Sequence, residues 1–217
     1  MSANQYQKHF IPLESNPDVF TQLTHELGVS PTLRFQDVLT LDEPALFPRP
    51  ALALILIFPT SETYETQISK EEATDEEDVV WFKQTINNAC GLYAIEPGSL
   101  LANLIETLNP CERALTLENS VELQTMYAMA ATGGDTLAPT NAEDEVDFHF
   151  VCFVKSNKNS RIYELDGDRA GPIDKGIILA SGDDMLAAGG LSIVKEYIQR
   201  EGSGGSGFSL MALVSTS

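Results

Sequence analysis

The sequence predicts an α+β fold whose sheet is mainly antiparallel. First, segments typical of strands and helices come in mixed order, without the regular strand–helix alternation of parallel sheets. Second, an unbroken apolar run, ALALILIF, covers residues 51–58. It is typical of a strand buried on both faces, and it is far shorter than the roughly 20 residues that span a membrane. Third, strand-like segments at 148–155 and 161–166 flank the polar sequence SNKNS, which predicts a hairpin.

Local signals predict the remaining elements. Short strands are expected at 9–13 and 33–39. Between them, Asn16 and Pro17 predict the start of a helix that Gly28 ends. Apolar spacing predicts four further helices, at 100–108, 110–117, 120–130 and 185–200. It also predicts a last strand at 207–214.

Two polar segments, 60–78 and 132–147, are rich in carboxylates and predict mobile surface loops. Across the 217 residues, 13 basic and 32 acidic side chains give a formal charge of −19. A chain of this length predicts a single domain over residues 1–217. Its charge argues against a partner that is a nucleic acid or an anionic membrane, because both would repel it. We expect a monomer.

The cysteines limit which kinds of site and which cellular compartment the sequence is compatible with. Cys90, Cys111 and Cys152 form no C-x-x-C pair, so neither a disulfide framework nor a zinc site is predicted. The first ten residues lack the apolar stretch of a signal peptide. We therefore expect a cytoplasmic protein, with nuclear entry left open, that uses no metal or other cofactor.

The segment WFKQTINNACGLYAI, residues 81–95, contains the first candidate site residues. Cys90 follows two asparagines that favour the start of a helix, where the positive end of the helix dipole stabilises a thiolate. Six residues earlier, Gln84 offers an amide donor of the kind that binds an oxyanion. By itself, a lone cysteine is more often a small core residue.

The second candidate group lies in the predicted hairpin. His149 shares a strand face with Val151 and Phe153, whereas Cys152 lies on the opposite face. Asp166 ends the partner strand before a glycine, where a carboxylate either forms the turn or orients an imidazole. Each residue has an ordinary structural explanation, but the order Gln, Cys, His, Asp is typical of papain-like cysteine hydrolases.

These residues lie in segments that resemble one family, the ubiquitin C-terminal hydrolases, which are cysteine deubiquitinases. The resemblance extends over nearly the whole chain, and KQTINNACG together with YELDG is its most specific part. The segments that carry it are PLESNPDVF (12–20), LFPRPALALILIFP (46–59), KQTINNACG (83–91), EPGSLL (96–101), DFHFVCFV (147–154), YELDG (163–167) and GFSLMAL (207–213).

The resemblance implies a fold and a set of catalytic roles. The fold would be a six-stranded antiparallel sheet between helices, papain-like, with a knotted chain path. Cys90 would be the nucleophile, His149 its general base and Asp166 the residue that orients His149. Gln84 would stabilise the oxyanion together with the Cys90 backbone N–H. The segment 131–146 resembles the loop that crosses the family's active site.

The resemblance also implies a partner, ubiquitin, whose C-terminal tail carries arginines beside its glycines. Glu14, Asp18 and Asp37 match acidic positions that contact the basic surface of ubiquitin in this family. The alternative interpretation is that these three carboxylates are ordinary solvated surface residues. The implied reaction is hydrolysis of amide, ester or thioester adducts at the C-terminal glycine of ubiquitin.

The chain departs from the family directly after the nucleophile. Ile95 is followed by Glu96, Pro97 and Gly98, whereas family members have about a dozen more residues, so the helix is expected to end after about two turns. Two other hypotheses follow from this truncation. One is a ubiquitin-binding pseudoenzyme with a misplaced triad, and the other is an unstable product without function.

Overall fold

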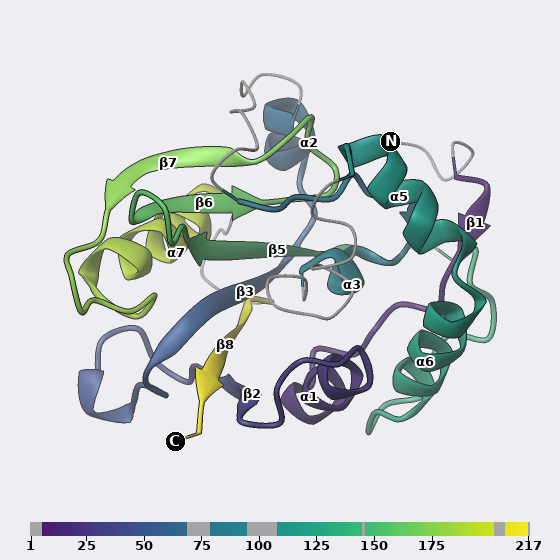
Figure 1. Ribbon diagram of the computed structural model, residues 1–217, viewed down its shortest axis with the longest axis horizontal. Coiled ribbons are helices and arrows are strands. Elements are labelled where there is room, and N and C mark those ends of the chain that lie inside the picture. The colour runs from purple at the N-terminus through teal and green to yellow at the C-terminus, as the bar shows by residue number, and fades with distance from the viewer. Residues whose placement is uncertain (1–5, 69–78, 95–107, 145, 202–206, 217) are drawn as a thin grey trace.

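The computed structural model describes residues 6–68, 79–94, 108–144, 146–201 and 207–216 (Figure 1). Six strands form one antiparallel sheet in the order β2-β8-β3-β5-β6-β7, as the sequence predicted. The short strands β1 and β4 form a separate parallel pair. The bounds are β1 Lys8–His9, β2 Leu33–Asp37, β3 Ala51–Pro59, β4 Ile86–Asn87, β5 Phe148–Lys155, β6 Arg161–Leu165, β7 Ile173–Ile178 and β8 Ser209–Ser215.

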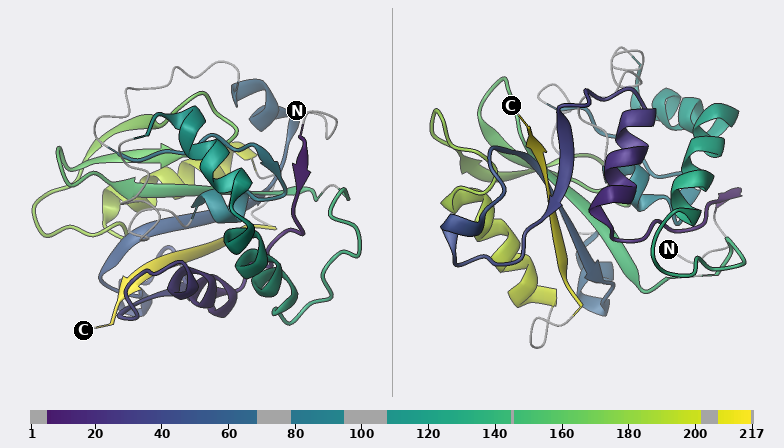
Figure 2. Two further views of the ribbon diagram at one scale, coloured as in Figure 1. Left: turned by 45° about the vertical axis from the view of Figure 1, so that its right-hand side comes forward. Right: turned by 90° about the horizontal axis from the view of Figure 1, so that it is seen from below.

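Helices lie on both faces of the sheet. Figure 2 shows the sheet nearly edge-on in its right-hand view, with α7 on one side and α1, α5 and α6 on the other. None of the described helices is long and apolar enough to cross a membrane. The bounds are α1 Pro17–Glu26, the 3-10 turn η2 Pro44–Leu46, α2 Glu62–Ile68, α3 Cys90–Ala94, α5 Pro110–Asn119, α6 Val121–Thr132 and α7 Ala188–Glu201.

Strand β3 is buried by both helical layers, which explains its unbroken apolar sequence. Its odd-numbered residues from Ala53 to Ile57 belong to the core shared with α1, α3, α5 and α6. Its even-numbered residues from Leu54 to Phe58 belong to the core shared with α2 and α7. A strand with two apolar faces is held firmly in register, because a slip by one residue would disturb both cores.

The helix starts agree with the capping signals in the sequence. The Asn16 side chain accepts a hydrogen bond from the Asp18 N–H (2.9 Å), and Pro17 occupies the first helical position. Asn109 and Glu112 form a reciprocal capping box at the start of α5. The helix expected at 185–200 begins later, at Ala188, and Met185 packs against its first turn. A Cβ at Gly190 would lie 2.0 Å from the Met185 carbonyl oxygen.

Several elements differ from the sequence prediction. Residues 62–68, expected within a mobile loop, form α2, and strands β4 and β7 were not predicted. The strand expected at 9–13 is shorter and begins one residue earlier, as β1 at Lys8–His9. The segment 132–147 has no helix or strand beyond Thr132 in its described residues, as expected. The helix expected at 100–108 and the expected end of α3 at Pro97 lie outside the described residues, apart from Leu108.

Candidate active site

The candidate nucleophile, Cys90, is the first residue of α3 and is 7% exposed. Two residues earlier, Asn88 has φ +59°, a left-handed conformation that asparagine tolerates better than most residues. The Asn88 side chain donates hydrogen bonds to the carbonyls of Ala142 (3.1 Å) and Asp144 (2.9 Å). These bonds attach the segment that resembles the crossing loop to the backbone beside Cys90.

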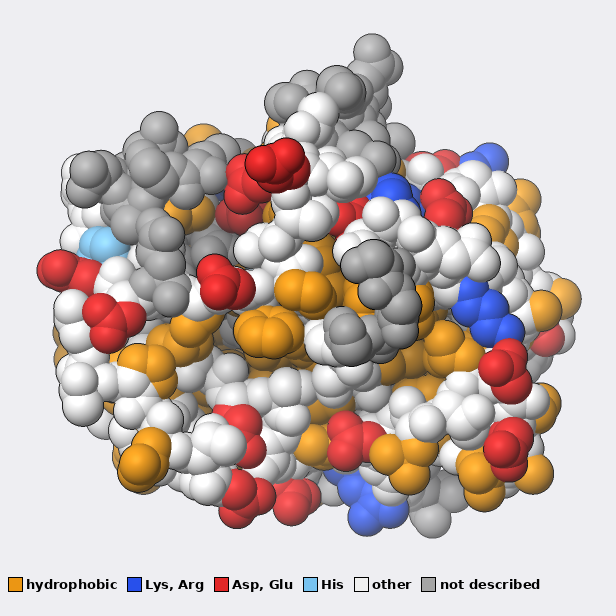
Figure 3. Space-filling view, turned by 180° about the vertical axis from the view of Figure 1, so that it is seen from behind, with side chains coloured by type: hydrophobic (Ala, Val, Ile, Leu, Met, Phe, Trp, Pro, Cys, Tyr) orange, Lys and Arg blue, Asp and Glu red, His pale blue; other side chains and the backbone are white. Residues whose placement is uncertain are grey.

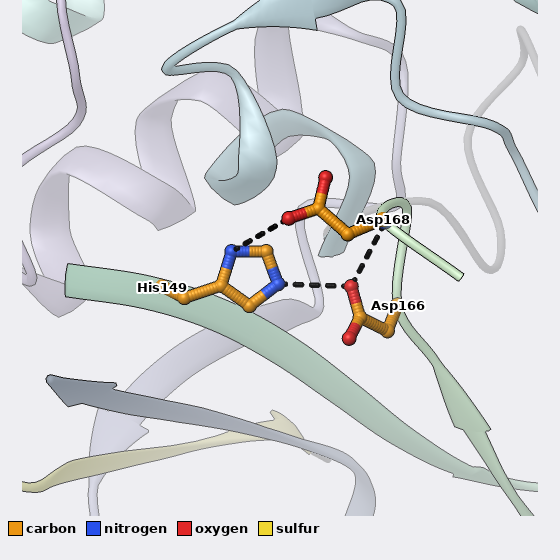
Figure 4. A group of neighbouring side chains, drawn as sticks. All are labelled: His149, Asp166 and Asp168. Atoms are coloured by element: carbon orange, nitrogen blue, oxygen red, sulfur yellow. Dashed lines mark hydrogen bonds and ion pairs between the residues drawn. The ribbon is translucent and has the colours of Figure 1, made fainter. Parts of the chain in front are cut away.

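The register of the hairpin brings His149 and Asp166 together. Strands β5 and β6 pair Cys152 with Leu165, so Asp166 follows directly at the strand end. His149 Nε2 lies 2.8 Å from Asp166 Oδ1, and both side chains are buried (Figure 4). With Nε2 on Asp166, Nδ1 is the nitrogen left for a thiol, and Cys90 is close enough to contribute to the raised pKa of His149. The sequence-predicted Cys90, His149 and Asp166 therefore meet at one place.

The electrostatics favour an imidazolium–carboxylate pair. Burial disfavours the charged form of His149, but the charge and hydrogen bond of Asp166, with smaller contributions from Cys90 and Asp168, raise its pKa well above 6.5. Burial likewise disfavours the Asp166 carboxylate, but His149 and Arg169 outweigh this and lower its pKa to about 2. His149 is thus prepared to hold a proton beside the candidate nucleophile.

Two residues that the sequence analysis missed also contact this pair. The Tyr64 hydroxyl, from α2, donates to Asp166 Oδ2 at 2.8 Å. Asp168 Oδ2 lies 3.9 Å from His149 Nδ1, on the opposite side of the ring from Asp166 (Figure 4). Asp168 lies in the turn after β6, where strand alternation no longer applies, so no periodic signal indicates it. No local signal indicates Tyr64, which belongs to an acidic segment expected to be mobile.

Gln84 is buried next to the turn that carries Asp166. Its backbone N–H donates to the Gly167 carbonyl at 3.0 Å. A Cβ at Gly167 would lie 2.7 Å from the Gln84 Cβ, so this close approach requires a glycine. Gln84 Oε1 is buried and accepts no hydrogen bond from the described part of the chain. Such buried polar atoms are rare in proteins and call for an explanation, a catalytic role among them.

The three acidic residues predicted to contact ubiquitin line one hollow of about 550 Å³, together with Asp135. We call it the acidic hollow. Within it, Glu14 Oε2 accepts hydrogen bonds from the Thr136 N–H (2.8 Å) and hydroxyl (2.7 Å), which lower the pKa of Glu14. Burial and the neighbouring charge of Asp18 raise the pKa of Asp37. A cation entering the acidic hollow would relieve this repulsion.

His149, Asp166 and Asp168 are also the group of described residues whose spacing could suit a metal ion, with ligand atoms within 4.8 Å of one another. However, Asp166 Oδ1 already accepts from His149 and from the Asp168 N–H (3.0 Å), and Oδ2 accepts from Tyr64. Because these oxygens are engaged in holding the imidazole, we assign no metal to the group.

An antiparallel sheet between helices, with a cysteine at a helix start facing a histidine–aspartate pair, defines a papain-like cysteine hydrolase. Comparison with known proteins gives the family. The model of the ubiquitin carboxyl-terminal hydrolases, family 1, matches residues 10–199, and the chain belongs to this family.

Relatives resemble the chain along most of its length. It is 34% identical over 236 residues to ubiquitin carboxyl-terminal hydrolase 3 of Arabidopsis thaliana, covering 98% of this chain and 97% of that one. It is 33% identical to isozyme L1 of Equus caballus, covering 93% and 96%. The crystal structure of the Trichinella spiralis UCH37 catalytic domain bound to ubiquitin vinyl methyl ester superposes with a TM-score of 0.76. It is 26% identical, and the match covers 97% of this chain and 98% of that one.

Proposed function

We propose that this chain is a thiol-dependent deubiquitinase that hydrolyses amide, ester or thioester bonds at the C-terminal glycine of ubiquitin. The observation that carries the proposal is the buried His149–Asp166 pair, at 2.8 Å, beside Cys90 at the start of α3. The pseudoenzyme hypothesis requires a misplaced triad, and this arrangement argues against it.

The proposed reaction has two halves. The Cys90 thiolate attacks the glycine carbonyl, and the oxyanion accepts hydrogen bonds from the Gln84 amide and the Cys90 backbone N–H. The His149 imidazolium then gives its proton to the leaving amine, alcohol or thiol, which leaves a thioester on Cys90. In the second half, His149 takes a proton from water while the water oxygen attacks the thioester carbonyl. The C–S bond then breaks, which releases the ubiquitin tail as a carboxylic acid that ionises in solution and restores the Cys90 thiolate beside the His149 imidazolium. Asp166 keeps Nδ1 of His149 directed at the reacting atoms.

A cavity of about 470 Å³ adjoins the acidic hollow, and Glu14 and Ser15 line both. Its walls include Leu13 and Phe150, together with Leu137 of the segment 131–146. Leu13 also packs within 3.1 Å of the Cβ position of Gly91, next to the nucleophile. Figure 3 shows hydrophobic side chains across the middle of one face of the molecule, with acidic side chains around them.

These two adjoining surfaces suit an extended peptide that carries both basic and apolar residues. We propose that arginines of the ubiquitin tail enter the acidic hollow, where Glu14, Asp18 and Asp37 contact them, and that an apolar residue enters the cavity. Charge complementarity of this kind increases the association rate and the specificity more than the affinity.

The decisive test is release of a fluorophore from the C-terminus of ubiquitin. Cys90→Ala should abolish turnover, whereas the matched variant Cys111→Ala, which removes an exposed free thiol, should keep it. Turnover that survives in Cys90→Ala would overturn the proposal. Ubiquitin binding without turnover by the folded wild-type chain would favour the pseudoenzyme instead.

We further propose a monomer that binds no nucleic acid and works in the cytoplasm, with nuclear entry left open. The net charge of −19 supports the lack of nucleic-acid binding, because phosphates would be repelled. A reducing compartment keeps a catalytic thiol active. Size-exclusion chromatography with light scattering tests the oligomeric state, and a dimer mass would contradict it.

A further inference from the structure

His149 lies between two carboxylates, and only the one at Nε2 leaves Nδ1 free for the thiol of Cys90. Asp166 binds Nε2 at 2.8 Å, whereas Asp168 lies 3.9 Å from Nδ1 (Figure 4). If the ring moved toward Asp168, Nδ1 would be occupied by a carboxylate instead of facing the thiol. The active arrangement therefore depends on whatever makes Asp166 the preferred partner of His149.

We propose that Tyr64 is the positioning residue that makes this choice. Its hydroxyl fixes the Asp166 carboxylate, and its ring limits the movement of the imidazole. The proposal rests on the proposed function, since the reaction needs Nδ1 directed at Cys90. Tyr64 touches neither the nucleophile nor the bond to be cleaved, so it acts through Asp166 and His149.

The hydroxyl of Tyr64 is well placed to orient Asp166. It donates to Oδ2 at 2.8 Å, while Oδ1 accepts from His149 and from the Asp168 N–H. Arg169 Nε lies farther from Oδ2, at 3.6 Å, and donates its short hydrogen bond of 2.6 Å to Glu164 instead. Tyr64 thus contributes the shorter contact to the second oxygen, and this contact resists rotation of the carboxylate.

The ring of Tyr64 packs directly against the imidazole. The two ring centroids are 5.1 Å apart with an interplanar angle of 39°. Phe58 closes the group, in edge-to-face contact with both Tyr64 (5.1 Å, 77°) and His149 (5.8 Å, 82°). Such aromatic contacts favour defined geometries, so the imidazole is restricted in the directions in which it can turn.

Helix α2 holds Tyr64 in place. The Tyr64 side chain is 1% exposed, and its backbone N–H donates to Ser61 Oγ at 3.1 Å. The same Ser61 hydroxyl forms a hydrogen bond with Glu201, at the end of α7. The position of Tyr64 is therefore set by two helices that lie on one face of the sheet, whereas Cys90 packs in the core on the other face.

The first experiment compares Tyr64→Phe with the wild type in steady-state hydrolysis of ubiquitin carrying a C-terminal fluorophore. The matched control is Tyr163→Phe, which also removes a buried hydroxyl, in this case one that accepts from Asn159 at 2.9 Å. We expect kcat to fall about 10- to 100-fold in Tyr64→Phe, because small misplacements of reacting groups are costly, with KM changed less than about twofold. A kcat within about twofold of the Tyr163→Phe value would overturn the proposal.

A double mutant tests the choice between carboxylates. If Tyr64 favours Asp166 over Asp168, then Asp168→Asn in the Tyr64→Phe background removes the competing partner and should restore kcat at least about threefold. If the Tyr64→Phe variant has the same kcat with and without Asp168→Asn, Tyr64 does not select between the two carboxylates and the proposal is overturned. Likewise, Tyr64→Phe should cost little further kcat in an Asp166→Asn background, and a full additional loss there would show that Tyr64 does not act through Asp166.

A third readout needs no ubiquitin. The rate of Cys90 alkylation by iodoacetamide against pH reports the thiolate that His149 supports. Among the described residues, the groups facing His149 are Asp166 and Asp168 after β6, Cys90 on α3 and Tyr64 on α2. A loosened Asp166 stabilises the imidazolium less, so the alkylation profile of Tyr64→Phe should move to higher pH. A profile that superposes on that of Tyr163→Phe would overturn the inference.

These readouts separate the inference from the proposed function. A wild-type chain that releases no fluorophore would contradict the function, while the alkylation profile would still decide the role of Tyr64. If Tyr64→Phe does not fold, Ser61→Ala replaces it. That variant keeps the Tyr64 hydroxyl but loosens α2, and it should move the alkylation profile in the same direction. An unmoved profile would count against the proposal.

Discussion

At the scale of single residues, the charge state of His149 depends on the carboxylate next to it. Burial alone would favour the neutral ring, but Asp166 raises the pKa of His149 well above 6.5. A folded-state pKa above the unfolded value stabilises the protein fully below about pH 6.5, and this contribution is lost as the pH rises through the folded pKa. The pair therefore stabilises the folded state most in acidic to neutral solution.

The corresponding prediction concerns the Asp166→Asn variant. Removing the carboxylate leaves burial as the main influence on the imidazole, so the pKa of His149 should fall. NMR titration of the histidine ring protons measures it directly, and His9 and His25 serve as internal controls. An unchanged His149 titration in Asp166→Asn would contradict this account of the electrostatics.

Gly167 gives a second prediction at this scale. A methyl group there would lie 2.7 Å from the Gln84 Cβ and 3.2 Å from its backbone nitrogen, so Gly167→Ala must displace Gln84 or the Asp166 turn. Since an oxyanion donor contributes on the order of 10²- to 10³-fold to kcat, we expect a loss approaching this size at nearly constant KM. Fluorogenic kinetics measure it, and kcat at the wild-type level would mean that Gln84 has no such role.

At the scale of elements, α2 shows how a short helix gains its stability from tertiary contacts. Seven residues are too few for an isolated helix to be stable in water. Tyr64 is buried against Phe58, and Ser61 connects the helix to α7. The acidic residues that predicted a loop remain on the exposed side of the helix, at Glu62 and Glu65.

Ser61→Ala should therefore reduce stability by about 0.5–2 kcal/mol, the usual cost of losing a helix N-cap. Its Oγ accepts from the Tyr64 N–H at 3.1 Å, and the alanine cannot replace this bond. Urea unfolding of the variant and the wild type measures the difference. A suitable comparison is Thr66→Ala, within the same helix, whose hydroxyl bonds to the Glu62 carbonyl at 2.7 Å. We expect this change to cost less than the loss of the cap, and the reverse order would contradict the account.

At the scale of the whole molecule, the charge of −19 sets the long-range field that a partner meets. If the basic tail of ubiquitin is drawn toward the acidic hollow, salt should lower kcat/KM more than it lowers kcat, because screening acts on encounter. The measurement is kcat/KM at ionic strengths from about 0.02 to 0.5 M, where the Debye length shrinks several-fold.

The acidic hollow should dominate this salt dependence. The double variant Asp18→Asn/Asp37→Asn should lower kcat/KM at low salt and flatten its dependence on ionic strength. The control is Glu122→Gln, a change at an exposed carboxylate that lines neither the acidic hollow nor the cavity. If both variants show the same salt slope, net charge alone explains the effect and the hollow does not recognise the tail.

The sequence by itself determined much of the local structure and named the candidate site residues. Apolar runs predicted β3, turn residues predicted the β5–β6 hairpin, and capping residues predicted α1, because these signals act between residues close in the chain. Strand alternation also predicted that His149 and Cys152 lie on opposite faces, as they do. The motif around Cys90 and the family resemblance predicted that Cys90 and Asp166 act together with His149.

Only the tertiary structure decided which side chains surround that site. Tyr64 reaches Asp166 across 102 positions of the chain, and Asp168 approaches His149 only because the chain turns at Gly167. Helix α2 and strand β7 likewise became clear only in the fold. Such contacts depend on how separate elements pack, and periodicity along a single segment holds no information about its distant neighbours.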